Sequence, residues 1–233
     1  MRPVQRGPSP GVFTSYKQAK EPLVRVLGTY CSYCERRVVT ELAVEHIQPK
    51  GLPKYAHLEC EWANFLLACK NCNSAKGDTD VNPADFFLPD RDNTIRAFEY
   101  PDDGSVIPAN DLDAGQTTLA QATINLVALN TVTHPNWTDA DSLQSALDRW
   151  SQRQAAITQA KAAKANLAVA DNPAHRSSIE MLAENAGFFS VWMDRFNSDA
   201  DMRLRFIRRL LGTDTDSFDS ATGVAVARPG GQL

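Results

Sequence analysis

The sequence lacks the long apolar runs that are typical of membrane proteins. No stretch of its 233 residues approaches the roughly 18 consecutive apolar residues of a membrane span. The first residues, MRPVQRGPSPGVF, also lack the apolar run of a secretory signal peptide. These absences predict a cytoplasmic protein that does not bind a membrane.

The chain also lacks a surplus of basic residues. Lysine and arginine number 24 and aspartate and glutamate 28, which gives a formal net charge of -4. That charge by itself argues against a phosphate-carrying partner. The acidic residues gather in residues 81–115, which hold 2 basic and 8 acidic residues, whereas residues 1–80 hold 11 basic and 8 acidic ones. The small basic excess of the first 80 residues is as typical of a solubilising surface as of a binding site.

Cysteine is scarce, but four of the five cysteines form two C-x-x-C pairs, Cys31/Cys34 and Cys69/Cys72. In a cytoplasmic protein the thiols stay reduced, so the two pairs predict one tetrahedral four-cysteine Zn²⁺ site. Two alternatives are four buried thiols that only pack, and a redox site, although no βαβ pattern surrounds either pair. Cys60 is left over, and we interpret it as a packing residue.

The segment between and after the pairs predicts the order strand, long loop, strand, helix. Residues 42–47 and 65–68 are short apolar runs typical of strands, and prolines and glycine at 49, 51 and 53 end the first of them. A helix is expected from Lys70, with Gly77 placed to stop it.

Five polar residues of this segment have complementary chemistry. Glu45 and Asn73 offer oxygen ligands that suit Mg²⁺ or Mn²⁺, and His46 can remove a proton from an attacking water. Because neighbours on a strand point to opposite faces, Glu45 and His46 share a site only if the strand ends or twists there. Lys76 can face a phosphate, and Asn64 can brace the loop. Taken singly, each is typical of an ordinary polar residue; together they predict metal-assisted phosphodiester hydrolysis.

In these motifs the sequence resembles the HNH endonucleases of the ββα-metal class, in their zinc-knuckle variant. The resemblance is carried by C-x-x-C at 31–34, EH at 45–46, Asn64, and C-x-x-C-N-x-x-K at 69–76. It implies that His46 is the general base, that Glu45 and Asn73 hold the catalytic Mg²⁺ or Mn²⁺, that Asn64 fixes the loop, and that the cysteines hold a structural Zn²⁺. Glu45 stands where many members have Asp or His, and Asn73 where His is frequent.

A narrower resemblance extends beyond the motif. The runs LGTYCSYCERRV, LAVEHIQPKG and YAHLECEWANFLLACKNCNSAKGD are similar to those of the nucleases of Septu-type and retron-associated anti-phage systems. This likeness implies the effector nuclease subunit of a defence system, together with an ATPase partner subunit. The substrate is nucleic acid, with DNA expected more than RNA, although HNH chemistry treats the phosphates of both alike. The partner is expected to dock on an aromatic and arginine surface formed by Trp150, Trp192 and the arginines of residues 203–209.

The predicted fold is α+β, with a ββα-metal HNH module and a mainly α-helical C-terminal region. We expect an extended N-terminal arm at 1–24, the nuclease module at 25–80, an acidic connecting segment at 81–115, a helical region at 116–211 and an irregular tail at 212–233. Two alternatives belong to other classes of protein. One is a non-catalytic zinc-binding module that binds nucleic acid or a protein, and the other is an interaction subunit whose nuclease centre is vestigial.

Overall fold

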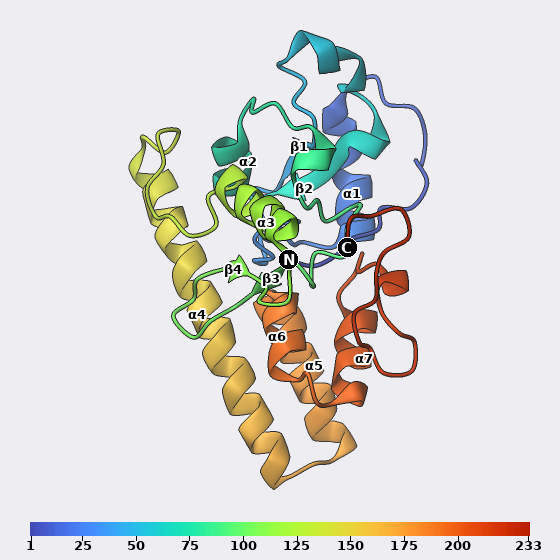
Figure 1. Ribbon diagram of the computed structural model, residues 1–233, viewed down its shortest axis with the longest axis vertical. Coiled ribbons are helices and arrows are strands. Elements are labelled where there is room, and N and C mark those ends of the chain that lie inside the picture. The colour runs from blue at the N-terminus through green and yellow to red at the C-terminus, as the bar shows by residue number, and fades with distance from the viewer.

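The computed structural model describes all 233 residues and confirms the α+β class. A small antiparallel sheet and the short helix that follows it lie in the upper part of the molecule in Figure 1. The sheet joins β1 (Ala43–His46) to β2 (Phe65–Ala68), with His46 opposite Phe65. Helix α2 (Lys70–Lys76) begins two residues after β2, and α1 (Lys20–Leu27) packs against both strands. The order of strand, loop, strand and helix is the one that the sequence predicts.

Local sequence explains why these elements form where they do. All four residues of β2 are buried, as expected for a continuous apolar run. Helix α2 ends because Gly77 adopts a left-handed φ of 50°, a conformation that glycine reaches at little steric cost.

The C-terminal region is helical, as the periodicity predicts, and none of its helices is long and apolar enough to cross a membrane. Helix α4 packs against α5 and α6, and α5 packs against α7 (Figure 1). Four of the helices begin at an Asp or Asn whose side chain accepts a backbone N–H of the first turn. The helices are α3 (Ala114–Leu126), α4 (Ala140–Val169), α5 (Pro173–Ala186), α6 (Phe189–Arg195) and α7 (Ala200–Arg209).

The helical region has a break between α5 and α6. Apolar residues recur at helical spacing through the run SSIEMLAENAGFFSVWMDRF, yet α5 ends at Ala186 and α6 begins at Phe189. At the break, Gly187 has a φ of 72° and Phe188 donates its N–H to the Glu35 carbonyl oxygen at 3.0 Å. A Cβ on Gly187 would lie 2.7 Å from the same oxygen. The helix therefore stops where its backbone pairs with the loop that carries Cys31 and Cys34.

The N-terminal arm is extended for a shorter distance than expected. Residues 16–19 form a 3-10 helix that continues into α1, because a proline in the first turn, here Pro22, is compatible with a helix. The arginines of the arm bind the protein itself. Arg2 is buried and donates to the Leu27 carbonyl oxygen, and Arg6 donates to the Phe65 carbonyl oxygen at 2.7 Å and pairs with Asp90.

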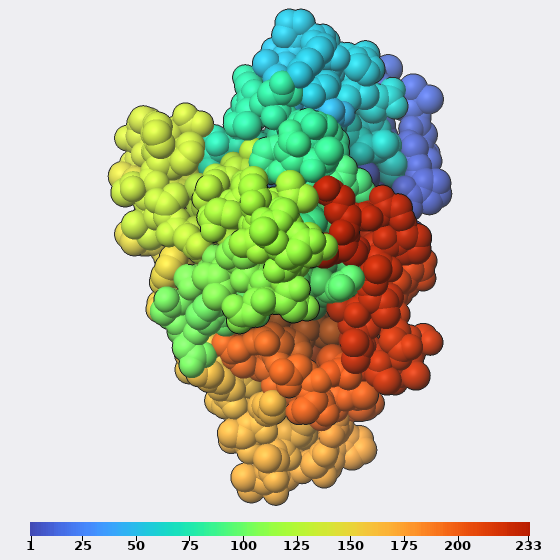
Figure 2. All heavy atoms as spheres, viewed as in Figure 1, coloured from blue at the N-terminus to red at the C-terminus, as the bar shows by residue number.

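One continuous core joins the regions that the sequence suggests are separate. The acidic segment contributes buried Phe87 and Leu88 as well as the short strands β3 (Phe98–Glu99) and β4 (Ile107–Pro108). The tail is irregular as expected, and Phe218 anchors it in the same core. In Figure 2 residues 81–115, drawn in green, lie between the upper module and the lower helices on the face shown. Residues 81–115 are thus part of the packing, and not only the solvated connection that their charge suggests.

Candidate metal centre and active site

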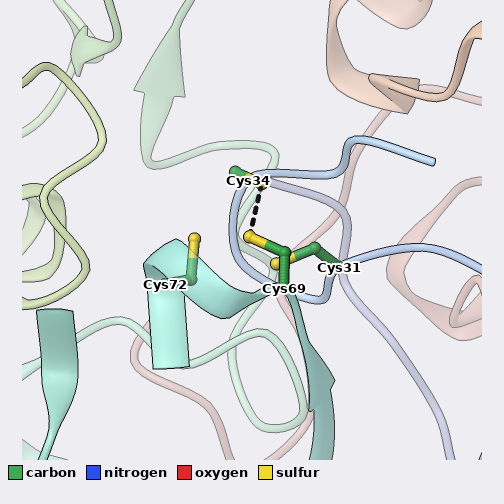
Figure 3. A group of neighbouring side chains, drawn as sticks. All are labelled: Cys31, Cys34, Cys69 and Cys72. Carbon is green, nitrogen blue, oxygen red and sulfur yellow. Dashed lines mark hydrogen bonds between the residues drawn. The ribbon is translucent and has the colours of Figure 1, made fainter. Parts of the chain in front are cut away.

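The four paired cysteines meet in one buried cluster (Figure 3). Cys31 and Cys34 lie in the loop after α1, whereas Cys69 precedes α2 and Cys72 lies in its first turn. The four sulfur atoms lie within 4.8 Å of one another, and those of Cys34 and Cys69 are 3.7 Å apart. A tetrahedral zinc site with Zn–S bonds of about 2.3 Å places its sulfurs about 3.8 Å apart. The cluster therefore fits a bound Zn²⁺.

The electrostatics of the cluster also favour a cation. Burial raises the pKa of the Cys31 and Cys72 thiols well above the ordinary value. Hydrogen bonds from the other three thiols lower the pKa of Cys69 well below it. Burial thus opposes the ionisation of all four thiols unless a cation compensates their charge.

A cavity of about 670 Å³ is bordered by four of the five other candidate residues. Glu45 and His46 border it from β1, and Asn73 and Lys76 border it from α2. Both Glu45 and His46 reach the cavity although they are neighbours on a strand, because His46 is the last residue of β1. The fold thus brings four of the residues expected to serve phosphodiester hydrolysis to the border of one cavity.

The His46 imidazole is held in a defined orientation. Its ring packs edge-to-face against Tyr16 and Phe65, with centroids 5.0 Å and 5.2 Å away, and its Nε2 lies 2.9 Å from the Glu59 carbonyl oxygen. A carbonyl oxygen only accepts, so Nε2 carries the proton and the lone pair is on Nδ1. Burial lowers the pKa of His46. The ring is therefore neutral at neutral pH and can act as a base through Nδ1.

Glu45 forms a buried ion pair with Lys76. The Lys76 Nζ lies 3.0 Å from the Glu45 Oε1, and each side chain is only 2% exposed. Burial raises the pKa of Glu45 to about 7, although Lys76 acts in the opposite direction. The Glu45 Oε1 thus has the Lys76 ammonium as its partner in this structure, and a divalent cation bound to the carboxylate would replace that contact.

The two asparagines occupy different places. Asn64 lies just before β2, and its side chain accepts the Gln48 N–H at 2.9 Å and donates to the Gln48 carbonyl oxygen at 3.0 Å. It therefore links the two ends of the long loop. Asn73 is half-buried on α2 and borders the cavity itself, where its amide oxygen is a second possible oxygen ligand.

The cavity also has walls that the sequence motifs do not indicate. Asp141 and Ser145, from the first turns of α4, also border it. Tyr16 and Lys50 close another side, with the Lys50 ammonium 5.0 Å from the centre of the Tyr16 ring. No local pattern marks these residues, because only the tertiary fold brings α4 and the N-terminal arm to the cavity.

Trp192 is not part of the aromatic and arginine surface that we expected on the C-terminal helices, whereas Trp150 is half-buried and Arg208 is exposed. Trp192 is fully buried and stacks on Phe196 within the core. Its indole N–H donates to the Gly187 carbonyl oxygen, so burial leaves no polar group of this side chain unpaired. Arg205 and Arg209 form ion pairs with glutamates of α5. This surface therefore does not offer the docking site that we expected from Trp192.

The segment that holds the four-cysteine cluster also matches a known protein family. Residues 31–79 match the family model of the HNH endonucleases. The HNH segment contains all four cysteines of the cluster, and HNH endonucleases act on nucleic acids. No curated protein matches the chain. The resemblance to HNH endonucleases is thus confirmed for this segment, which covers about a fifth of the chain.

Proposed function

We propose that the protein is a metal-dependent endonuclease that hydrolyses phosphodiester bonds in nucleic acid. The observation that carries this proposal is the cavity that His46, Glu45, Asn73 and Lys76 border together, within the HNH segment. A zinc-binding module that only binds a partner would not require these four residues around one cavity.

His46 is the general base in this proposal. Its Nδ1 accepts a proton from a water molecule while the water oxygen forms a bond to phosphorus. The bond from phosphorus to the 3' oxygen breaks on the opposite side, which leaves a 5'-phosphate and, after protonation, a 3'-hydroxyl. Packing against Tyr16 and Phe65 and the contact with Glu59 hold the imidazole in one orientation.

Glu45 and Asn73 are the residues that would hold Mg²⁺ or Mn²⁺. Such a cation, when bound, stabilises the negative charge that develops on the leaving 3' oxygen. Lys76 contacts Glu45 in this structure, so we propose that it turns toward the substrate phosphate once a cation binds the carboxylate. Asn64 acts at a distance, because it holds the loop between the strands.

Cleavage assays test the proposal directly. We expect the purified chain to cut plasmid, linear duplex or single-stranded DNA in preference to tRNA when Mg²⁺ or Mn²⁺ is present. A short exposure to EDTA, which removes the catalytic cation before the structural zinc, should stop the reaction. Binding of nucleic acid without cleavage of any of these substrates would instead favour the non-catalytic module.

We further propose that the protein is the effector nuclease of a cytoplasmic anti-phage system and acts with an ATPase partner subunit. The support is the similarity of the runs around the cysteine pairs to Septu-type and retron-associated nucleases. Lys50 and Lys70, which border the cavity, are paired with Glu59 and Asp139. Because these carboxylates neutralise the two ammonium groups, the chain alone is expected to bind phosphate weakly and a partner to supply affinity.

Co-expression with the product of the neighbouring gene, followed by size exclusion, tests the partner. A stable complex is expected. Full activity of the chain alone, with no partner recovered from its native cells, would contradict the partner and leave the nuclease assignment standing.

A further inference from the structure

The four-cysteine cluster lies at a junction between the HNH segment and α4. The Asn71 side chain on α2 donates to the Ser142 carbonyl oxygen at 2.9 Å and accepts from the Ser145 hydroxyl at 2.7 Å. The Trp137 indole N–H donates to the Ser74 hydroxyl at 2.9 Å. A helix of seven residues such as α2 is too short to be stable alone. Its position therefore depends on these contacts from outside the HNH segment.

Arg149 makes the contact that reaches the metal ligands. This α4 residue is 1% exposed, and its Nη1 donates to the Cys72 Sγ at 3.5 Å. Its Nη2 donates to the Thr131 carbonyl oxygen at 3.2 Å and to that of Ala128. The partners of Arg149 are backbone carbonyl oxygens and the Cys72 sulfur, with no carboxylate among them, and a buried charge without a counter-ion is costly. The anionic group that it contacts is the thiolate cluster.

A second buried arginine, Arg36, also lies where the cluster meets α4. Arg36 donates to the Asn71 side chain at 3.3 Å and to the Ser145 hydroxyl at 2.9 Å. Four thiolates and one divalent cation together carry a charge of -2. Arg36 and Arg149 together carry a charge of +2. The filled site is therefore electrically balanced by residues of the protein.

We propose that Arg149 is a positioning residue of the metal site, which neutralises and orients the Cys72 thiolate and thereby holds α2, with Asn73, at the cavity. Arg149 lies 70 residues beyond the end of the HNH segment. The C-terminal region thus completes a metal centre whose four ligands all belong to the motif. The proposal depends on metal binding by the cysteines and not on cleavage, so its failure would leave the nuclease proposal untouched.

Cobalt substitution tests the contact through the ligand itself. In Co²⁺-loaded protein the sulfur-to-cobalt charge-transfer band responds to a hydrogen bond on a thiolate. Arg149→Met removes the donor and the charge but keeps an unbranched side chain. We expect this variant to shift the band and to release zinc to a chelator about 10- to 100-fold faster than the unchanged protein, as is typical when a residue that contacts a metal ligand is lost.

Arg153 provides the matched control. It lies one turn further along α4, is also 1% exposed, and donates to the carbonyl oxygens of Gly104 and Leu129 but to no cysteine. Arg153→Met should lower the melting temperature without shifting the charge-transfer band or accelerating zinc release. Equal effects of the two substitutions on the band and on zinc release would overturn the proposal, as would an unchanged band in Arg149→Met.

A milder pair keeps the test decisive if Arg149→Met does not fold. Arg149→Lys retains a cation but loses the forked donor geometry, and Arg153→Lys makes the same change away from the sulfurs. We expect a shifted band and faster zinc release in Arg149→Lys alone. Identical behaviour of the two lysine variants would contradict the proposal.

Discussion

At the scale of single residues, His46 sets the pH dependence of the proposed reaction. Burial lowers its pKa from the ordinary 6.5, so the imidazole stays neutral, and able to accept a proton, to a lower pH than a free histidine. With Mg²⁺ or Mn²⁺ kept saturating at every pH, so that protonation of Glu45 does not limit the rate, the acidic limb of the profile of kcat/KM against pH should therefore lie below 6.5. Steady-state rates across this range check the prediction. A limb at or above 6.5 would show that another group or another His46 environment controls the rate.

Glu45 gives a second prediction at this scale. Its pKa of about 7 means that protons compete with a cation for the carboxylate below neutral pH. Binding of Mn²⁺ should tighten roughly tenfold between pH 6 and pH 8, because the ionised fraction of Glu45 rises by about that factor. Glu45→Gln should bind Mn²⁺ weakly and largely lose this dependence. Titration followed by electron paramagnetic resonance measures both, and an unchanged affinity in Glu45→Gln would remove Glu45 from the metal site.

At the scale of elements, Gly77 determines where α2 ends. Its φ of 50° is left-handed, and a Cβ there would meet no atom closer than 3.6 Å. Gly77→Ala should therefore lower the free energy of unfolding through backbone strain alone, by about 1 to 2 kcal/mol. Gly11 is a suitable control, because its φ is not positive and no atom lies within 4 Å of an added Cβ. Denaturant unfolding that finds equal effects at the two positions would contradict this account.

Some elements of the fold can be predicted from local sequence signals, and others depend on tertiary contacts. The strands β1 and β2 and helix α2 follow from short apolar runs and a stop glycine, which are local signals. The break between α5 and α6 has no such signal apart from Gly187, because it depends on pairing with the loop around Glu35. Likewise, motif spacing predicts the ligands and the residues of the cavity, but it carries no information on Arg149 or Asp141, which arrive with α4.

At the scale of the whole molecule, the metal site is part of the global stability. One core runs through the HNH segment, the acidic segment and the C-terminal helices, and the cysteine cluster belongs to it. Removing the metal, or replacing Cys72 with Ser, should therefore reduce the helical signal of the entire chain in one transition. Metal analysis should find about one zinc per chain. Circular dichroism after prolonged chelation checks the prediction, and metal-free protein that melts as before would refute the structural role of zinc.

The proposed function depends above all on His46 as the general base, and measuring cleavage by His46→Ala tests this role. The loss of a general base predicts a rate lower by about 10²- to 10⁴-fold, with zinc content and melting temperature nearly unchanged. His57→Ala, which alters an exposed histidine of the same loop, serves as the control and should cleave at the parental rate. Cleavage by folded, zinc-loaded His46→Ala at the parental rate, on a substrate that the parent cuts, would contradict the account.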